Sequence, residues 1–234
     1  MAVRGRGTTP VVAVALEVGA KRCFASALDW PGWARAGRTP QQALEALEAY
    51  ADRYREAMAA AGHTPPGLRL PARAEAELVV TETLPGDATT DFGAPSAVAE
   101  DDRRPTDEAQ ARRLAAAVRV SWAALDASAA AAPAELRKGP RGGGRDRDAV
   151  VTHVIGAHAA YARMIGVRVP AREWETPEGL AAAQAQVLDV LARPSDGAPL
   201  RENGWPARYA ARRMAWHVLD HAWEITDRAD PAVG

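Results

Sequence analysis

The first part of the chain has the pattern of short strands followed by a helix. Apolar and β-branched residues run almost continuously over 11–18 and 22–28, and the Gly-Ala-Lys between the two runs suits a hairpin turn. Thr39–Pro40 then predicts the start of a helix, because threonine caps helices and proline fits their first position. The apolar stripe of this helix repeats every three or four residues, and Gly62 is its predicted end.

The rest of the chain has a helical pattern that follows one further strand and a linker. Residues 76–86 are predicted to form the strand, and 89–104 have a polar, proline-containing composition without periodicity. Four amphipathic segments follow; they begin near Asp107, Asp148, Thr176–Pro177 and Pro206. Four helices joined by breaks of moderate length favour an antiparallel bundle. We therefore expect an α+β protein with an α/β module at 1–88, a linker at 89–104 and a four-helix bundle at 105–234.

Composition and charge limit the partners and the compartment. The 29 basic and 30 acidic side chains give a net charge of -1, which offers no positive surplus for nucleic acid. The single cysteine, Cys23, excludes an internal disulfide, and its place in an apolar run predicts a buried, unreactive thiol. No run approaches the roughly 18 apolar residues of a membrane helix, and the first ten residues have no signal-peptide core. We expect a cytoplasmic protein without membrane contact.

Four of the five histidines lie in the helical half, and they are the main candidates for chemistry. His217 and His221 stand four residues apart on the inward stripe of the last segment, where two imidazoles can chelate one divalent ion. A third ligand has to come from another helix. His153 is the candidate, because Gly156 and Ala157 leave room for a neighbouring helix beside it. Three nitrogen ligands leave coordination positions open, which is typical of a reactive site.

Each of these residues also has an ordinary structural interpretation. Two histidines on an amphipathic helix are more often packed than metal-bound, and this pair lacks the glutamate of His-Glu-x-x-His proteases. His158 lies roughly 140° around its helix from His153, which favours a packing or interface role. Arg213 could bind a substrate carboxylate or be a solvated surface residue. Glu224 could orient a ligand histidine or pair with Arg228 four residues on.

The helical half resembles a known family of metalloproteins. The sequence GGGRDRDAVVTHVIGAHAAYARMIG, followed later by RRMAWHVLDHAWEITDR, is similar over about 106–228 to the DinB-like family of metal-dependent four-helix bundles. That family includes thiol-dependent transferases and mycothiol-dependent maleylpyruvate isomerases. It binds a divalent ion through one histidine of its second helix and an H-x-x-x-H or E-x-x-x-H pair of its last helix, and His153, His217 and His221 match these positions.

This resemblance implies a cofactor, a cosubstrate and a substrate class. The cofactor would be a divalent ion, with zinc as the first candidate and nickel as the second. A low-molecular-weight thiol would be the cosubstrate, because a bound cation lowers the pKa of a thiol and so supplies a nucleophile. The alanine- and arginine-rich composition is typical of a high-G+C genome, and actinobacteria with such genomes use mycothiol. The substrate would be a small molecule.

The segment FASALDWPGWARAGRTPQQALEALEAY resembles the HicB-like module, a β-β-β-α partial RNase H-like fold known from antitoxins, over about 11–62. The matching residues are those of turns and caps: Asp29, Pro31, Gly32, Gly37, Thr39 and Pro40. None of them needs a catalytic role. Antitoxins of this family bind a toxin and often carry a DNA-binding segment, which is not apparent here. Trp30 and Trp33 flank the turn, and they could anchor an interface or pack under the sheet.

Two functional hypotheses follow from these patterns. The first is a metal-dependent transferase or isomerase, with the front module as a fused partner or a wall of the substrate pocket. The second is a non-enzymatic binding or regulatory protein whose HicB-like module docks a protein partner, and a homodimer is a further assembly to test. The loop at 137–148 is glycine-rich but lacks the Gly-Lys-Ser/Thr of a phosphate loop, so we expect a mobile connector beside the second helical segment.

Overall fold

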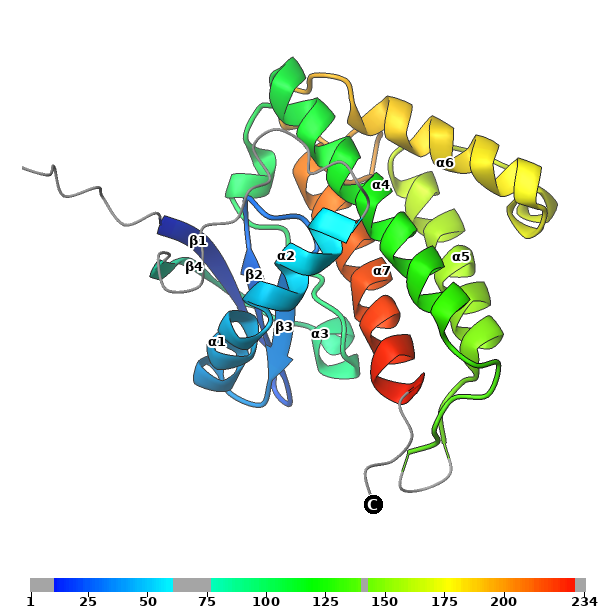
Figure 1. Ribbon diagram of the computed structural model, residues 1–234. Helices are drawn as coiled ribbons and strands as arrows, with labels where there is room; N and C mark the ends of the chain where they lie inside the picture. The colour runs from blue at the N-terminus through cyan, green and yellow to red at the C-terminus, as the bar shows by residue number, and fades with distance from the viewer. Residues whose placement is uncertain (1–10, 61–76, 140–142, 230–234) are drawn as a thin grey trace, which may run out of the picture. The chain divides into compact units, whose positions relative to one another are not determined.

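The protein is a mixed α+β chain that divides into two compact units (Figure 1). Our computed structural model describes residues 11–60, 77–139 and 143–229. The first unit contains a four-stranded sheet, and the second contains the four longest helices. The α+β class predicted from the sequence is therefore confirmed.

The sheet of the first unit has the order β3-β2-β1-β4. Its strands are β1 (Val11–Val18), β2 (Cys23–Ala27), β3 (Ala34–Gly37) and β4 (Glu77–Pro85). β1 pairs antiparallel with β2 and parallel with β4, and β2 pairs antiparallel with β3. Every residue of β2 is buried, which explains its uninterrupted apolar run. The hydrophobic pattern missed β3 because it is only four residues long and contains an arginine.

The helix predicted from Thr39 to Gly62 is interrupted in the structure. α1 (Pro40–Ala49) and α2 (Ala51–Ala60) are separated at Tyr50, whose φ of -90° and ψ of 1° lie outside the helical region. The guanidinium of Arg35 lies 3.9 Å from the centre of the Tyr50 ring, a contact with β3 that the helical pattern does not record. The predicted end at Gly62 lies outside the described residues. The division between the two units passes through α2.

Trp33 and Cys23 are buried in the first unit. The indole Nε1 of Trp33 donates to the carbonyl of Leu47 at 2.8 Å, and its ring stacks on Tyr54 with centroids 5.8 Å apart. Trp33 therefore packs inside the unit, whereas Trp30 is only partly buried. The buried position predicted for Cys23 is confirmed, and burial raises the pKa of its thiol, which disfavours the reactive thiolate.

The segment predicted as a linker at 89–104 carries regular structure. It contains most of α3 (Ala88–Phe92) and the 3₁₀ turn η2 (Asp101–Arg103). In the first unit, the carboxylate of Glu17 accepts hydrogen bonds of 2.9–3.0 Å from the backbone nitrogens of Ser96–Ala97. Hydrogen bonds to a strand far away in the sequence hold part of this segment, so no local hydrophobic period could reveal it.

The second unit packs four helices around one apolar core. They are α4 (Glu108–Ala131), α5 (Arg147–Met164), α6 (Pro177–Leu191) and α7 (Ala207–Ala229), with the 3₁₀ turn η3 (Ala171–Glu175) before α6. α7 contacts α4 and α5, and α6 packs on α4. Most residues of α7 are buried, including three arginines and one histidine. Buried polar groups need partners, so α7 is the helix on which a functional site is most expected.

Three of the four predicted helix starts are close to the observed ones, and the start of α5 differs. The carboxylate of Asp107 caps α4, and the hydroxyl of Thr176 caps α6. For α5, Asp148 was the predicted cap, but Asp146 occupies the cap position. The carboxylate of Asp146 makes no capping bond, because it accepts the backbone N–H of Leu136 at 3.1 Å and so closes the loop before the helix.

α4 is, by length and composition, a candidate membrane helix among the described residues. Its most apolar 18-residue window has a mean hydropathy of 1.2. No such segment was expected from the sequence; α4 reaches this value because it is rich in alanine. A buried helix in the core of a soluble protein can have the same length and composition, and 44% of this window is buried. The hydropathy of α4 is therefore weak evidence for a membrane span.

Candidate metal centre

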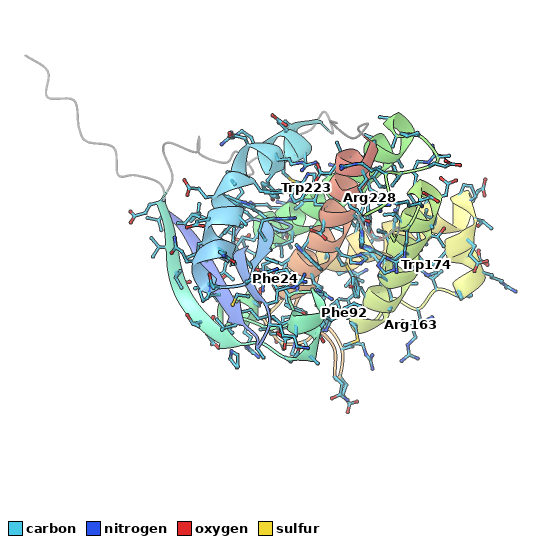
Figure 2. The ribbon with its side chains drawn as sticks, turned by 90° about the horizontal axis from the view of Figure 1, so that it is seen from below. Phe24, Phe92, Arg163, Trp174, Trp223 and Arg228 are labelled. Carbon is cyan, nitrogen blue, oxygen red and sulfur yellow. The ribbon has the colours of Figure 1, made fainter. Side chains whose placement is uncertain are left out.

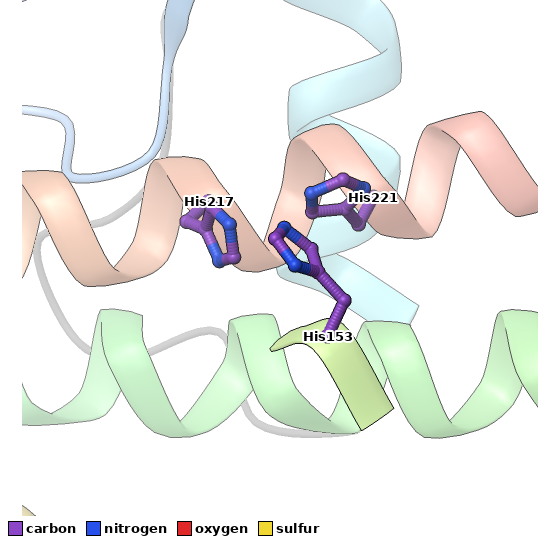
Figure 3. Close-up of side chains that lie close together, drawn as sticks. All are labelled: His153, His217 and His221. Carbon is purple, nitrogen blue, oxygen red and sulfur yellow. The ribbon is translucent and has the colours of Figure 1, made fainter. Parts of the chain in front are cut away.

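His153, His217 and His221 lie together between α5 and α7 (Figure 3). Each ring offers one candidate ligand nitrogen, and these three nitrogens all lie within 4.8 Å of one another. The centroid of the His153 ring is 5.2 Å from that of His217 and 4.9 Å from that of His221, and the latter two are 4.7 Å apart. The structure thus brings together the three histidines predicted as ligands. That they bind a metal stays a prediction.

The helical geometry explains why these rings meet. Side chains at i and i+4 lean over the same turn, so His217 and His221 present their rings side by side on α7. His153 comes from the facing helix α5. The expected role of Gly156 is wrong, because an added Cβ there would meet no atom within 4 Å. Close approach of α5 and α7 at the site does not depend on this glycine.

A buried ring nitrogen of His217 without a hydrogen bond supports the prediction that an ion binds at this centre. Its Nδ1 is buried and makes no hydrogen bond to any described residue. An unsatisfied buried polar atom costs free energy, so native structures seldom keep one without a reason. His217 is almost fully buried, whereas His153 and His221 are partly exposed. The cluster therefore has one deep ring and two rings nearer the surface, which fits a site that a cation could enter.

The environment of His153 and His217 favours their neutral form. Burial lowers the pKa of His217 far below its ordinary value, and the neighbouring histidines and Arg213 act in the same direction. Burial also lowers the pKa of His153, with the charge of His221 as the next contribution. A metal binds the neutral imidazole, so the lowered pKa values reduce competition from protons.

Glu224 contacts His221 and Arg228 at the same time. Its Oε2 lies 2.7 Å from Nδ1 of His221, and its Oε1 accepts from the guanidinium of Arg228 at 2.6 Å. The hydrogen bond from His221 lowers the pKa of Glu224, and the bond from Arg228 adds to this effect. Orientation of a histidine and pairing with Arg228 appeared as alternatives in the sequence. The structure contains both contacts.

No match was found when this chain was compared with protein-family models, with curated proteins and with solved structures.

His158 is a packing residue, as its place on the helix predicted. It is buried, and its Nδ1 accepts a hydrogen bond from the indole of Trp122 at 3.2 Å. Burial lowers the pKa of His158 to about 4, and the Met214 backbone offsets this in part. His158 also lines a small apolar cavity of about 40 Å³ between α4, α5 and α6. Its ring centroid is 6.1 Å from that of His217, so it lies one layer behind the cluster.

We predict that stability falls as the pH is lowered from 6.5 to 4, in part because of His158. Its pKa is about 4 in the folded chain and 6.5 when unperturbed. The unfolded chain therefore takes up the proton first, and acid favours unfolding within this window. The difference corresponds to roughly 3 kcal/mol at the acid end. Urea denaturation of the metal-free protein at pH 7 and pH 4 measures the loss, and His158→Gln should show a smaller one. An equal loss in both proteins would assign the effect to other groups.

Arg213 lies beside the cluster and is buried. The interpretation of Arg213 as a solvated surface residue is therefore wrong. Its guanidinium lies 5.4 Å from the ring centre of Tyr161 and 5.0 Å from that of Trp216. The Tyr161 ring is in turn 5.6 Å from that of His217. Burial raises the pKa of Tyr161, and Arg213 partly offsets this.

The two aromatic residues were not candidates from sequence. Trp216 immediately precedes His217, and Tyr161 lies about two turns after His153 on the same helix, roughly 80° around its axis. These spacings from the histidines could have marked both residues as neighbours of the site. An aromatic residue at such a spacing is common in any helical core, however, so only the structure shows that both rings contact one buried arginine.

Proposed function

We propose that the helical unit is a metal-dependent transferase or isomerase of the DinB-like type, with a divalent ion held by His153, His217 and His221. The convergence of three imidazoles from two helices carries this proposal. The unpartnered Nδ1 of His217 and the lowered pKa values of two of the rings support it. All-nitrogen imidazole sites suit zinc first and nickel second.

The donor set fits an ion with open coordination positions. A divalent cation held by these residues would lower the pKa of a coordinated thiol and so would supply a nucleophile at neutral pH. On one side of this position lies the buried ring of His217. Arg213, Tyr161 and Trp216 place a cation and two aromatic faces next to it. These residues suit a small substrate that carries an acidic group, with Arg213 as the partner of its carboxylate.

Titration of thiols into the cobalt-loaded protein tests this function. Cobalt(II) substitutes for zinc and develops strong near-ultraviolet absorption when a thiolate binds. We expect this absorption with mycothiol, saturating at one equivalent per chain, and none with a methylated thiol. Cobalt that binds without any response to mycothiol, glutathione or cysteine would remove the thiol-dependent reaction. A His153→Ala, His217→Ala, His221→Ala variant is the control for adventitious cobalt.

A second proposal concerns the first unit. The order of three antiparallel strands followed by α1 supports a HicB-like module, and we propose that this module docks a protein partner. The observation that favours docking is the exposed apolar side chains of the first unit. Val11 on β1 is 61% exposed, and Phe92 on α3, just beyond segment 1–88, is 89% exposed (Figure 2). Sedimentation of the wild-type chain and of Phe92→Ser tests the simplest partner, a second copy. A dimer that Phe92→Ser separates supports docking, and a monomer at high concentration contradicts the homodimer.

A further inference from the structure

We propose that Glu224 and Arg228 are positioning residues that fix the tautomer of His221 and connect it to the loop between α4 and α5. This inference rests on the proposed metal centre. Figure 2 shows Arg228 on α7, and the loop residues that contact it lie in the described parts of this loop, 132–139 and 143–146. Neither residue is among the three proposed ligands.

The contact between Glu224 and His221 selects which ring nitrogen can bind an ion. Oε1 of Glu224 is paired with the guanidinium of Arg228 at 2.6 Å, which keeps the carboxylate charged and an acceptor only. Oε2 can therefore face Nδ1 of His221 at 2.7 Å only if that nitrogen carries the hydrogen. Nε2 is then the ring nitrogen with a free lone pair, so it is the one that can bind an ion. Carboxylate–histidine pairs of this kind orient metal ligands and raise their basicity.

Arg228 is held by the loop as well as by Glu224. Its Nε donates to the carbonyl of Arg137 at 2.8 Å, and the backbone nitrogen of Arg137 donates to the carbonyl of Arg228 at 2.9 Å. A Cβ at Gly144, which has a φ of +122°, would lie 2.6 Å from Nη2 of Arg228. The loop thus packs against the guanidinium at two separate points. Displacement of the loop would release Arg228, and through it the carboxylate that orients His221.

The ion pair of Glu224 and Arg228 is less exposed than an ordinary surface pair on a helix. The Arg228 side chain is 16% exposed and that of Glu224 31%. α4 offers a matched pair with the same i, i+4 spacing, Arg112 and Glu108, which are 63% and 75% exposed and hydrogen-bond each other at 3.1 Å. Such exposed ion pairs contribute little to folding stability. Glu108→Ala is therefore the control for removal of a helical glutamate.

Two measurements on Glu224→Ala test the proposal. The first is the nitrogen NMR spectrum of His221 in the metal-free protein, where we expect the Nδ1–H tautomer in the wild type and its loss in the variant. The second is zinc affinity in competition with a chelator, where we expect a loss of about 10–100-fold. Glu224→Gln keeps an acceptor oxygen and should recover part of both readouts. Arg228→Met should lower zinc affinity less than Glu224→Ala, and Glu108→Ala should change neither readout.

The outcomes separate this inference from the metal centre itself. If the wild-type protein does not bind zinc, the proposed function fails, and the tautomer measurement still tests the role of Glu224. If Glu224→Ala keeps the Nδ1–H tautomer and a zinc affinity within about threefold of the wild type, the positioning role is overturned. Urea denaturation of each variant establishes that it folds, and Glu224→Gln gives the same test if the alanine variant does not.

Discussion

Replacement of His217 by alanine is expected to lower the zinc affinity of this protein by at least about 100-fold. Structural zinc sites with four ligands bind with apparent free energies of about 10–16 kcal/mol, which is roughly 3 kcal/mol for each ligand. His217 is the most buried of the three rings and lies within 5.2 Å of both others by ring centroid. Its loss removes one ligand and leaves a space that water enters. Competition with a fluorescent chelator at pH 7.5 measures the affinity.

His158→Gln is the matched control for this experiment. His158 is also a buried histidine next to the cluster, but it faces Trp122 and is not one of the three converging rings. We expect zinc affinity close to that of the wild type in this variant. If both variants lose affinity equally, the effect comes from disturbed packing in the helical core, and His217 is not a ligand.

Replacement of Arg212 by alanine is expected to destabilise the helical unit by about 3–5 kcal/mol. Arg212 makes a bidentate pair with Asp102, with Nε–Oδ1 at 2.8 Å and Nη2–Oδ2 at 2.5 Å. The two side chains are only 9% and 2% exposed. Removal of the arginine leaves a buried carboxylate without its counter-charge, and this desolvation cost is the reason for the large effect. The midpoint of urea denaturation, followed by circular dichroism, measures it.

Arg112→Ala provides the comparison, because it removes an exposed arginine from an ion pair of the same unit. Its expected cost is below about 1 kcal/mol. Asp102 also accepts the backbone N–H of Ala99 at 2.9 Å, so Asp102→Asn should retain part of the local structure. If Arg212→Ala lowers the free energy of unfolding no more than Arg112→Ala does, the pair of Asp102 and Arg212 does not stabilise the attachment of η2 to α7.

The sequence predicted the ligand candidates because their geometry follows from helical periodicity. His217 and His221 are four residues apart, which places them on one face of any α-helix. The third ring, His153, lies on the inward stripe of another helix, and burial of that stripe in the shared core brings it to α7. The strands at 11–18 and 23–27 were predictable for a similar reason, since strands that are mostly buried need runs of mostly apolar residues.

Contacts between residues far apart in the chain could not be predicted in this way. Asp102 and Arg212 are 110 positions apart, and neither stands out in an arginine- and aspartate-rich sequence. Tyr50, at the break between α1 and α2, has a ring contact with Arg35 of β3 that no helical pattern records. The Glu224–Arg228 spacing suggested an ordinary helical pair. Only the structure adds the contact with His221 and the attachment of Arg228 to the loop.

The metal content and ligand set of the purified protein test the central claim most directly. Protein loaded with zinc and then dialysed without chelator is analysed by elemental mass spectrometry and by zinc-edge X-ray absorption. We predict one zinc per chain, with three imidazole nitrogens at about 2.0–2.1 Å. The His153→Ala, His217→Ala, His221→Ala variant should hold almost none. Absence of zinc from the wild type, or equal zinc in the triple variant, would contradict the metal centre.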